Sequence, residues 1–186
     1  IIDGDSSDCT MAIYGNIDST TRITGFTIRN GIGCVYGQGG GIYVESASPR
    51  LDNLIIKNNI GSTNGGGICL NGNSNSIIDK VVLESNSAEA GGGLYSFNSN
   101  PVITNSSIQN NHSINGAGIF LELSSPNIEN VNITDNYAIS AGGGIYCGLS
   151  SYPEIAHVTI SNNTASHGGG ISSTHGSQPV LSNSIL

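Results

Sequence analysis

Six glycine clusters recur along this chain at nearly constant spacing. They begin at residues 39, 65, 91, 116, 142 and 168, so successive clusters are 25 or 26 residues apart. Glycine loses more backbone entropy on folding than any other residue, so such clusters are favourable only where the backbone geometry requires them. A fixed period of this length predicts a stack of similar structural units.

Apolar residues hold fixed places within each repeat and alternate with polar residues. This two-residue alternation predicts β-strands, and no segment has the longer period of an amphipathic helix. An earlier turn places Ile13, Ile23, Phe26 and Ile28 in the same four columns. The first column is Ile42, Ile68, Leu94, Ile119, Ile145 and Ile171, and the second is Leu51, Ile78, Ile103, Ile128, Ile155 and Leu181. The third is Leu54, Val81, Ser106, Val131, Val158 and Ser184, and the fourth is Ile56, Leu83, Ile108, Ile133, Ile160 and Leu186.

A repeat of this length divides into three short strands and three bends, with no room for a crossover helix. We therefore expect an all-β fold, a single-stranded parallel β-helix of about seven coils, as one domain over residues 1–186. Residues 1–38 form an irregular first coil with an insertion at 32–38, and 168–186 an incomplete last coil. The regular coils are expected at 39–64, 65–90, 91–115, 116–141 and 142–167.

An asparagine stands three residues after the fourth column in five consecutive repeats. Asparagine tolerates left-handed backbone at a bend, and stacked amides can donate to one another. We interpret the set as a structural ladder, the alternative being a row of ligand contacts. In the first turn Asn30-Gly31 occupies this place. The ladder residues are Asn59, Asn86, Asn111, Asn136 and Asn163.

The pairing of I-x-x-N with a following G-G-G/A-I/L/V, as in Ile56 to Asn59 with Gly65 to Ile68, resembles the repeats of bacterial polymorphic outer-membrane proteins. It is also similar to the right-handed parallel β-helix repeats of large secreted bacterial surface proteins. The resemblance covers residues 13–186 and implies right-handed coiling, export and an adhesive or stalk-like role. The same fold carries pectate-lyase-like enzymes, so the fold alone does not decide the function.

The charge composition excludes two classes of partner. The formal net charge is −8, and the only cations are Arg22, Arg29, Arg50, Lys57 and Lys80. A nucleic-acid-binding protein needs clustered Lys and Arg, and so does electrostatic docking on an anionic membrane. No apolar run approaches the length of a transmembrane segment.

Position five of the first strand in each repeat is mostly aromatic. Because side chains alternate across a strand, this position should face away from the coil interior. With coils ~4.8 Å apart, such a row can stack on sugar rings or on another protein. The alternative is that the aromatics cover one another or lie beneath a loop. The predicted ligand-binding residues are Tyr14, Tyr43, Tyr95, Phe120 and Tyr146, with Cys69 and Ser172 completing the row and Glu45 and Glu122 flanking it.

Asp52 and Asp79 fall in one column on adjacent coils, with Arg50 and Lys80 close by. Two carboxylates at that spacing would raise the pKa of one of them and can form the acid–base pair of a polysaccharide lyase or glycoside hydrolase. A surface cluster of salt bridges is the simpler interpretation. We therefore assign no catalytic residue and keep Asp52, Asp79 and Lys80 as the weaker, enzymatic alternative.

Two further groups concern metal and disulfide chemistry. Asp3, Asp5 and Asp8 form an acidic loop that can hold calcium, although an acidic turn is the simpler interpretation, and no other cofactor is indicated. Cys9 and Cys34 are about one coil apart, within reach of a disulfide. Cys69 and Cys147 are three coils apart and out of reach of each other.

The chain begins and ends inside the strand pattern, which leaves strand edges to be covered. Two interpretations stay open: further coils of a longer protein cover them, or copies stack end to end into a fibre. We expect a secreted or cell-surface rod without catalysis and with an adhesive or structural role. Its expected partners are an extracellular glycan, a surface protein, or other copies of itself.

Overall fold

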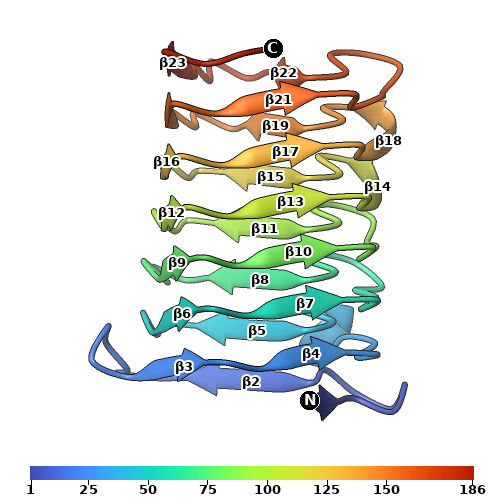
Figure 1. The fold of residues 1–186 in the computed structure, drawn as a ribbon, viewed down its shortest axis with the longest axis vertical. Helices are drawn as coiled ribbons and strands as arrows, with labels where there is room; N and C mark the ends of the chain where they lie inside the picture. Colours follow the sequence, from blue (N-terminus) through green and yellow to red (C-terminus); the bar gives the residue numbers. More distant parts are fainter.

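Successive turns of the chain stack along one axis in the computed structural model, which describes residues 1–186 (Figure 1). Each turn contributes one strand to each of three parallel, seven-stranded sheets, which we name A, B and C. The N-terminus lies at one end of the stack and the C-terminus at the other. This architecture confirms the predicted all-β solenoid of about seven coils.

Sheet B consists of the strands that follow the glycine clusters. Its members are β2 (Met11–Tyr14), β5 (Ile42–Glu45), β8 (Ile68–Asn71), β11 (Leu94–Phe97), β15 (Ile119–Glu122), β19 (Ile145–Gly148) and β22 (Ile171–Ser173). Sheet C comes next along each coil. Its members are β3 (Arg22–Thr24), β6 (Arg50–Asp52), β9 (Ile77–Asp79), β12 (Val102–Thr104), β16 (Asn127–Glu129), β20 (Glu154–Ala156) and β23 (Val180–Ser182).

Sheet A completes each coil before the next glycine cluster. Its members are β1 (Ile2–Asp3), β4 (Thr27–Arg29), β7 (Ile55–Lys57), β10 (Val82–Glu84), β13 (Ser107–Gln109), β17 (Asn132–Thr134) and β21 (Thr159–Ser161). A small two-stranded sheet, β14 (His112–Asn115) with β18 (Tyr137–Ala141), lies at the corner after sheet A. The one helical element is a 3₁₀ turn, η1 (Val35–Gly37), and no helix of the structure has the length and hydrophobicity needed to cross a membrane.

The strand register confirms the apolar columns in the regular coils. Ile68 pairs with Ile42 on one side and with Leu94 on the other. In the first coil, however, Met11 pairs with Ile42, and Ile13 pairs with Val44. The predicted placement of Ile13 was therefore wrong by two residues. A shift of two keeps the same face of a strand inward, so alternation alone does not distinguish the two registers.

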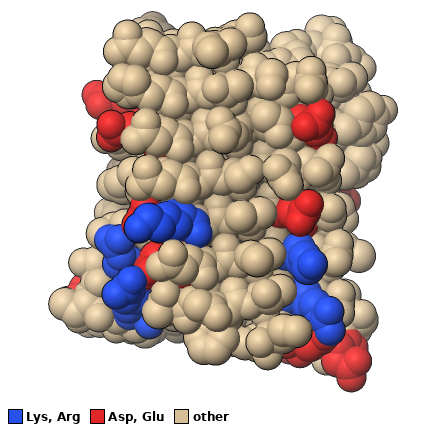
Figure 2. Space-filling view, in the orientation of Figure 1, with Lys and Arg blue, Asp and Glu red and all other residues tan.

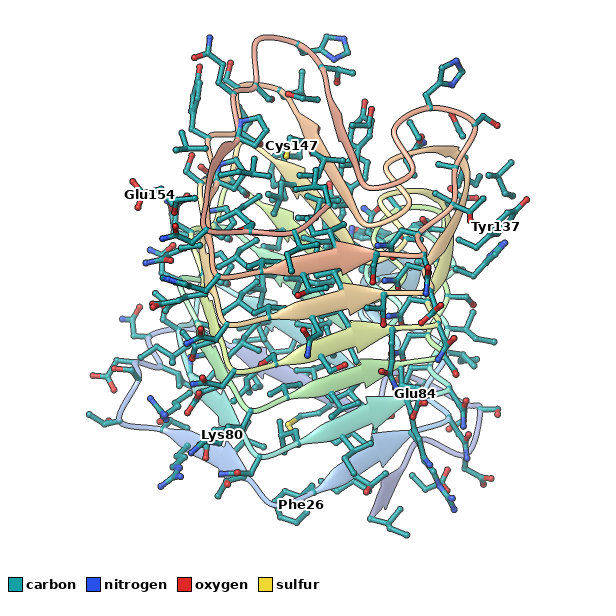
Figure 3. The ribbon with its side chains drawn as sticks, turned by 45° about the horizontal axis from the view of Figure 1, so that its top comes forward. Phe26, Lys80, Glu84, Tyr137, Cys147 and Glu154 are labelled. Carbon is teal, nitrogen blue, oxygen red and sulfur yellow. The ribbon has the colours of Figure 1, made fainter.

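The inward side chains of all three sheets form one core. It contains 26 buried residues, nearly all Ile, Leu and Val, that run the length of the stack. Figure 3 shows Cys147 within the coil, whereas Tyr137 and Glu154 point outward on opposite sides. Because each core layer contacts the layer above and below, the stack is stabilised by nearest-neighbour packing.

The asparagine ladder is confirmed and lies buried at the corner after sheet A. The Nδ2 of Asn86 donates to Oδ1 of Asn111 at 3.2 Å, and the backbone N–H of Asn86 donates to the same oxygen at 2.9 Å. Each ladder Nδ2 also donates to a main-chain carbonyl of the preceding coil, as Asn111 does to Leu83 at 3.0 Å. In the first coil the backbone N–H of Gly31 donates to Oδ1 of Asn59 at 3.0 Å.

The glycines of a cluster are required for different steric reasons. Gly65 has φ +67°, a left-handed conformation. A Cβ on Gly66 would lie 2.4 Å from the carbonyl oxygen of Ser87, and one on Gly67 would lie 2.6 Å from that of Gly93. The glycines are thus required by the close stacking of consecutive coils at this bend.

A second buried ladder, made of serine, was missed from the sequence. The backbone N–H of Ser74 donates to Oγ of Ser99 at 3.0 Å, and that of Ser99 to Oγ of Ser124 at 3.2 Å. Ser124 and Ser151 continue the pattern at 3.2 Å, and Ser151 and Ser177 at 2.9 Å. Serine is so frequent in this chain that the column did not stand out from the polar bends around it.

A proline follows two residues after this ladder in every regular coil except one. The proline column is Pro49, Pro101, Pro126, Pro153 and Pro179, and Ser76 takes its place in the coil between Pro49 and Pro101. The hydroxyl of Ser76 is buried and has no hydrogen-bond partner.

We expect Ser76→Pro to stabilise the protein by about 1 kcal/mol or more, because it removes that unpaired hydroxyl and restricts the unfolded chain. The measurement is the melting temperature, which should rise by a few degrees. A decrease would contradict the steric equivalence of this column.

Candidate functional site

The predicted aromatic row lies on the outer side of sheet B, but much of it is covered. The register places Tyr43, Cys69, Tyr95, Phe120, Tyr146 and Ser172 in one column. Tyr43, Cys69 and Tyr95 are buried and form a second apolar cluster outside the coil. Phe120 and Tyr146 are half-buried and continue the row.

Tyr14 does not belong to this column, which corrects its predicted place. Ala12 pairs with Tyr43, whereas Tyr14 pairs with Glu45. The cause is the same two-residue shift that misplaced Ile13. The ring of Tyr14 still lies near that of Tyr43, with centroids 5.7 Å apart, so it extends the aromatic surface from a neighbouring column.

The insertion at 32–38 covers the first part of the row. Cys34 and Val35 pack against the cluster of Tyr43, Cys69 and Tyr95. The thiol of Cys69 donates to Oε1 of Gln38 at 3.5 Å. The predicted insertion at 32–38 thus forms a wall beside sheet B.

A cavity of about 240 Å³ opens beside this wall. Asn71, Phe97 and Glu122 come from one outward column of β8, β11 and β15, and Tyr95 comes from the aromatic row. Gln38 and Asn64 complete the lining from the corner before sheet B. Two aromatic rings, three carboxamides and one carboxylate therefore surround the same space.

Hydrogen bonds fix the polar groups of the cavity. The hydroxyl of Tyr95 donates to Oε2 of Glu122 at 2.7 Å, and Nδ2 of Asn71 donates to the hydroxyl of Tyr43 at 3.4 Å. Burial raises the pKa of Tyr43 to about 12, and burial followed by the Glu122 hydrogen bond raises that of Tyr95 further. Both phenols therefore stay protonated at physiological pH, at which that of Tyr95 donates to Glu122 and that of Tyr43 accepts from Asn71.

The aromatic rings stack in series beyond the cavity. The Tyr95 and Phe120 ring centroids are 5.3 Å apart, and those of Phe120 and Tyr146 are 4.7 Å apart, with interplanar angles of 24° and 18°. The hydroxyl of Tyr146 lies 2.9 Å from that of Thr174. The row is thus a pre-ordered apolar strip that leads away from the cavity along the rod axis.

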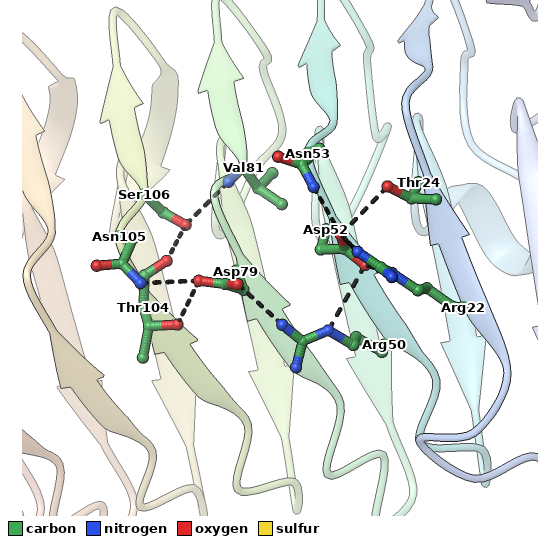
Figure 4. A network of polar contacts seen from close by, with 10 residues as sticks. All are labelled: Arg22, Thr24, Arg50, Asp52, Asn53, Asp79, Val81, Thr104, Asn105 and Ser106. Carbon is green, nitrogen blue, oxygen red and sulfur yellow. Dashed lines mark hydrogen bonds and ion pairs between the residues drawn. The ribbon is translucent and has the colours of Figure 1, made fainter.

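Asp52 and Asp79 are neighbours, as predicted, and lie in an ion-pair network on sheet C (Figure 4). Arg22 donates to both oxygens of Asp52 at 2.5 Å, and Arg50 lies between the two carboxylates. Nη2 of Arg50 donates to Asp79 at 2.9 Å, while its Nε lies 3.6 Å from Asp52. Lys80 is exposed beside them and forms no ion pair.

The expectation that one of these carboxyls has a raised pKa was wrong. Hydrogen bonds from Arg22 hold the pKa of Asp52 far below its ordinary value of 3.8. Hydrogen bonds from Asn105 and Thr104, at 2.8 and 2.9 Å, lower that of Asp79, with help from Lys80 and Arg50. Hydrogen bonds from Arg22 to Asp52, and from Asn105 and Thr104 to Asp79, favour the charged form of both carboxyls, so neither group is poised as a general acid at neutral pH.

This network predicts a specific dependence of stability on pH. A carboxyl whose pKa is depressed in the folded state contributes stability that is complete above the unfolded value, here 3.8, and is lost as the pH falls through the folded value. We therefore expect the urea midpoint to drop on acidification below about pH 4. Asp52→Asn should flatten this drop, whereas Glu154→Gln, an exposed carboxylate on sheet C, should not. Equal pH profiles for both variants would contradict the assignment.

The carboxylates of Asp3, Asp5 and Asp8 do not lie together as a metal-binding group, so the structure gives the calcium alternative no geometric support. Asp3 accepts hydrogen bonds from Asn30 at 3.0 Å and from Arg29 at 2.8 Å, and these lower its pKa. Asp8 instead lies with Cys9 and Cys34 in the only group of three potential metal ligands in the structure. Cys9 and Cys34 lie close together, as a disulfide between them would require, but both are free thiols in this structure.

The cations lie outside the cavity and toward the N-terminal part of the rod. Figure 2 shows the basic side chains in two groups in the lower half of the face that it displays, interspersed with acidic ones. Arg29 pairs with Asp3, and Arg22 and Arg50 pair with Asp52 and Asp79. These pairings leave no broad positive surface on that face.

The sequence indicated Tyr95 and Glu122 but missed four cavity residues. Asn71 and Phe97 lie in the same column as Glu45 and Glu122, so the register could have revealed them. Gln38 and Asn64 come from irregular segments in which no periodic signal is available.

One comparison with known proteins assigns the repeats to a family. A family model described as "Right handed beta helix region" matches residues 11–186. No curated protein and no solved structure matches the chain. The match covers every strand of the three sheets except β1, and it agrees with the right-handed coiling that the resemblance implied.

Proposed function

The chain belongs to the right-handed β-helix family, and on that premise we propose that it is a non-catalytic extracellular or cell-surface rod that binds a neutral saccharide along sheet B. The observation that carries the proposal is the cavity that joins Tyr95 and Phe97 to the polar side chains of Asn71 and Glu122. The adhesive role follows from the likeness to bacterial surface repeats.

A saccharide presents two kinds of surface that this cavity complements. Its ring has apolar C–H faces, which pack on aromatic rings, and its hydroxyls both donate and accept hydrogen bonds. Three carboxamides supply donors and acceptors, and the Glu122 carboxylate accepts. The volume of about 240 Å³ is slightly below the usual range for drug-sized ligands, which suits one sugar unit with its neighbours extending outside.

The charge of the site favours a neutral over an acidic saccharide. Glu122 is the only charged residue of the cavity lining, and Glu45 lies in the same column three coils away. No cation is available there to pair with a uronate or a sialate. An acidic sugar would therefore meet electrostatic repulsion in addition to its desolvation cost.

A glycan array with neutral and acidic members tests this proposal. We expect binding to neutral saccharides, weakened at least about tenfold by Phe97→Ala and by Glu122→Gln, which is a loss of about 1.4 kcal/mol each. Both residues are half-buried, so their substitution should spare the fold, unlike that of the buried Tyr43.

The control variant is Glu154→Gln, which neutralises an exposed carboxylate on sheet C, away from the cavity. It should bind as the unmodified protein does. Absence of binding to every neutral saccharide, or equal affinity of Phe97→Ala and the unmodified protein, would refute the proposal.

A further inference from the structure

Three metal-binding side chains converge at the junction of the first coil and the 32–38 insertion. A carboxylate oxygen of Asp8 and the sulfurs of Cys9 and Cys34 all lie within 4.8 Å of one another. Asp8 is exposed and the two cysteines are half-buried, so the group is open to solvent on one side. The saccharide proposal does not use these residues.

The two segments that carry these groups are held together by main-chain hydrogen bonds. The N–H of Ile32 donates to the carbonyl oxygen of Asp8 at 3.0 Å. The N–H of Cys34 donates to the carbonyl of Gln38 at 2.9 Å, and the N–H of Gly37 to that of Cys34 at 3.1 Å. The donor atoms are therefore brought together by the fold of both segments rather than by chance rotamers of two independent loops.

The spacing of the donors fits a small tetrahedral metal ion. Two sulfurs bound to one Zn²⁺ lie about 3.8 Å apart, and a sulfur and an oxygen about 3.6 Å apart. A disulfide would join only the two sulfurs, whereas a metal ion would also bind the carboxylate of Asp8, whose Oδ1 accepts the backbone N–H of Cys9 at 2.7 Å.

We propose that Asp8, Cys9 and Cys34 form a zinc site, with water as the fourth ligand. Two thiolates and one carboxylate are a donor set that Zn²⁺ binds well, whereas Ca²⁺ requires six or more oxygens. Binding displaces the protons of both thiols, and each sulfur then forms a bond to the metal. The ion fastens the insertion to the first coil, so it also fixes the position of Gln38 at the wall of the cavity.

Zinc titration of the reduced chain tests the site, with a chromophoric chelator as competitor. We expect one equivalent of Zn²⁺ to bind, and Co²⁺ to give thiolate-to-metal charge-transfer absorption. Removing a direct ligand costs more than removing an outer-shell partner, so Cys34→Ser should weaken Zn²⁺ binding by at least about a hundredfold. Asp8→Asn should weaken it by at least about tenfold.

The matched control is Asp5→Asn, which removes another exposed carboxylate of the same loop that lies outside the group. It should leave Zn²⁺ affinity unchanged. The proposal is overturned if the reduced protein binds no zinc, or if Cys34→Ser binds as tightly as the unmodified chain. It is equally overturned if refolding in air, with dissolved O₂ as the oxidant and equimolar Zn²⁺ present, yields a Cys9–Cys34 disulfide, seen as a mass deficit of two hydrogens.

Discussion

Replacing Asn111 with alanine should lower the free energy of unfolding by about 4 kcal/mol or more, a large effect for one substitution. Oδ1 of Asn111 accepts two hydrogen bonds from Asn86, one from its backbone N–H at 2.9 Å and one from its Nδ2 at 3.2 Å. Its Nδ2 donates to Leu83 and Asn136, each at 3.0 Å. Alanine would leave several of these buried groups without a partner, and each costs about 1–3 kcal/mol.

The control for this substitution is Asn132→Ala. Asn132 is exposed on β17, and its side chain forms no hydrogen bond within the protein. We expect its replacement to change stability by no more than about 0.5 kcal/mol. The urea midpoint followed by circular dichroism compares the two variants. Similar midpoints would show that the buried amides do not stabilise the stack.

The second large effect is expected for Gly93→Ala, the third glycine of its cluster. The added Cβ would lie 2.6 Å from the carbonyl oxygen of Gly118 and 3.0 Å from a methyl group of Ile108. The contacted main chain belongs to the next coil and cannot move without disturbing the sheet. We expect a loss of about 3 kcal/mol, at the upper end for overpacking.

Gly170→Ala is the matched control, because Gly170 occupies the same place in the last cluster. There the nearest atom to an added Cβ is a methyl carbon of Ile160 at 3.6 Å, an ordinary contact. Its urea midpoint should therefore stay close to that of the unmodified protein. If both alanine variants unfold alike, the glycines are required for a reason other than close stacking of coils.

The period of the sequence was sufficient to predict the fold, because stacking makes one physical requirement recur in every coil. Every coil needs an inward apolar side chain at the same place, as in the column of Ile78, Ile103 and Ile128. Every coil also needs a side-chain amide at the corner after sheet A, as in the ladder from Asn59 to Asn163. Only a few residue types satisfy either requirement. The register of the first coil was less certain, because a shift of two residues keeps Ile13 facing inward.

The surface around the cavity was harder to predict, because it depends on residues that break the repeat. Tyr43 is outward on its strand, yet it is buried by Val35 and Cys34 of the insertion. Alternation gives the side of the sheet on which a residue lies, but it does not reveal what covers that side. The cavity itself depends on Gln38 and Asn64, which lie at corners that have no periodic pattern.

The pair of Asp52 and Asp79 shows a different limit of prediction from sequence. The columns correctly placed Asp52 beside Asp79, but the sign of their pKa shifts depended on the direction of the Arg22 and Arg50 side chains. Both arginines lie in one column, two positions before the column of these carboxylates, with Arg22 one coil before Arg50. The ion pairs therefore form between residues that the strand register brings together on the outer side of sheet C, and these residues are not neighbours along the chain.

The most direct test of the stacked arrangement is the set of nuclear Overhauser contacts between backbone protons of register partners. Ile103 should contact Ile78 and Ile128, and the protected side-chain amide protons of Asn86 should lie close to Asn111. We expect such contacts between residues 25 to 27 positions apart in all three sheets. Contacts confined to near neighbours in the chain, or paired in antiparallel order, would contradict the β-helix and every site derived from it.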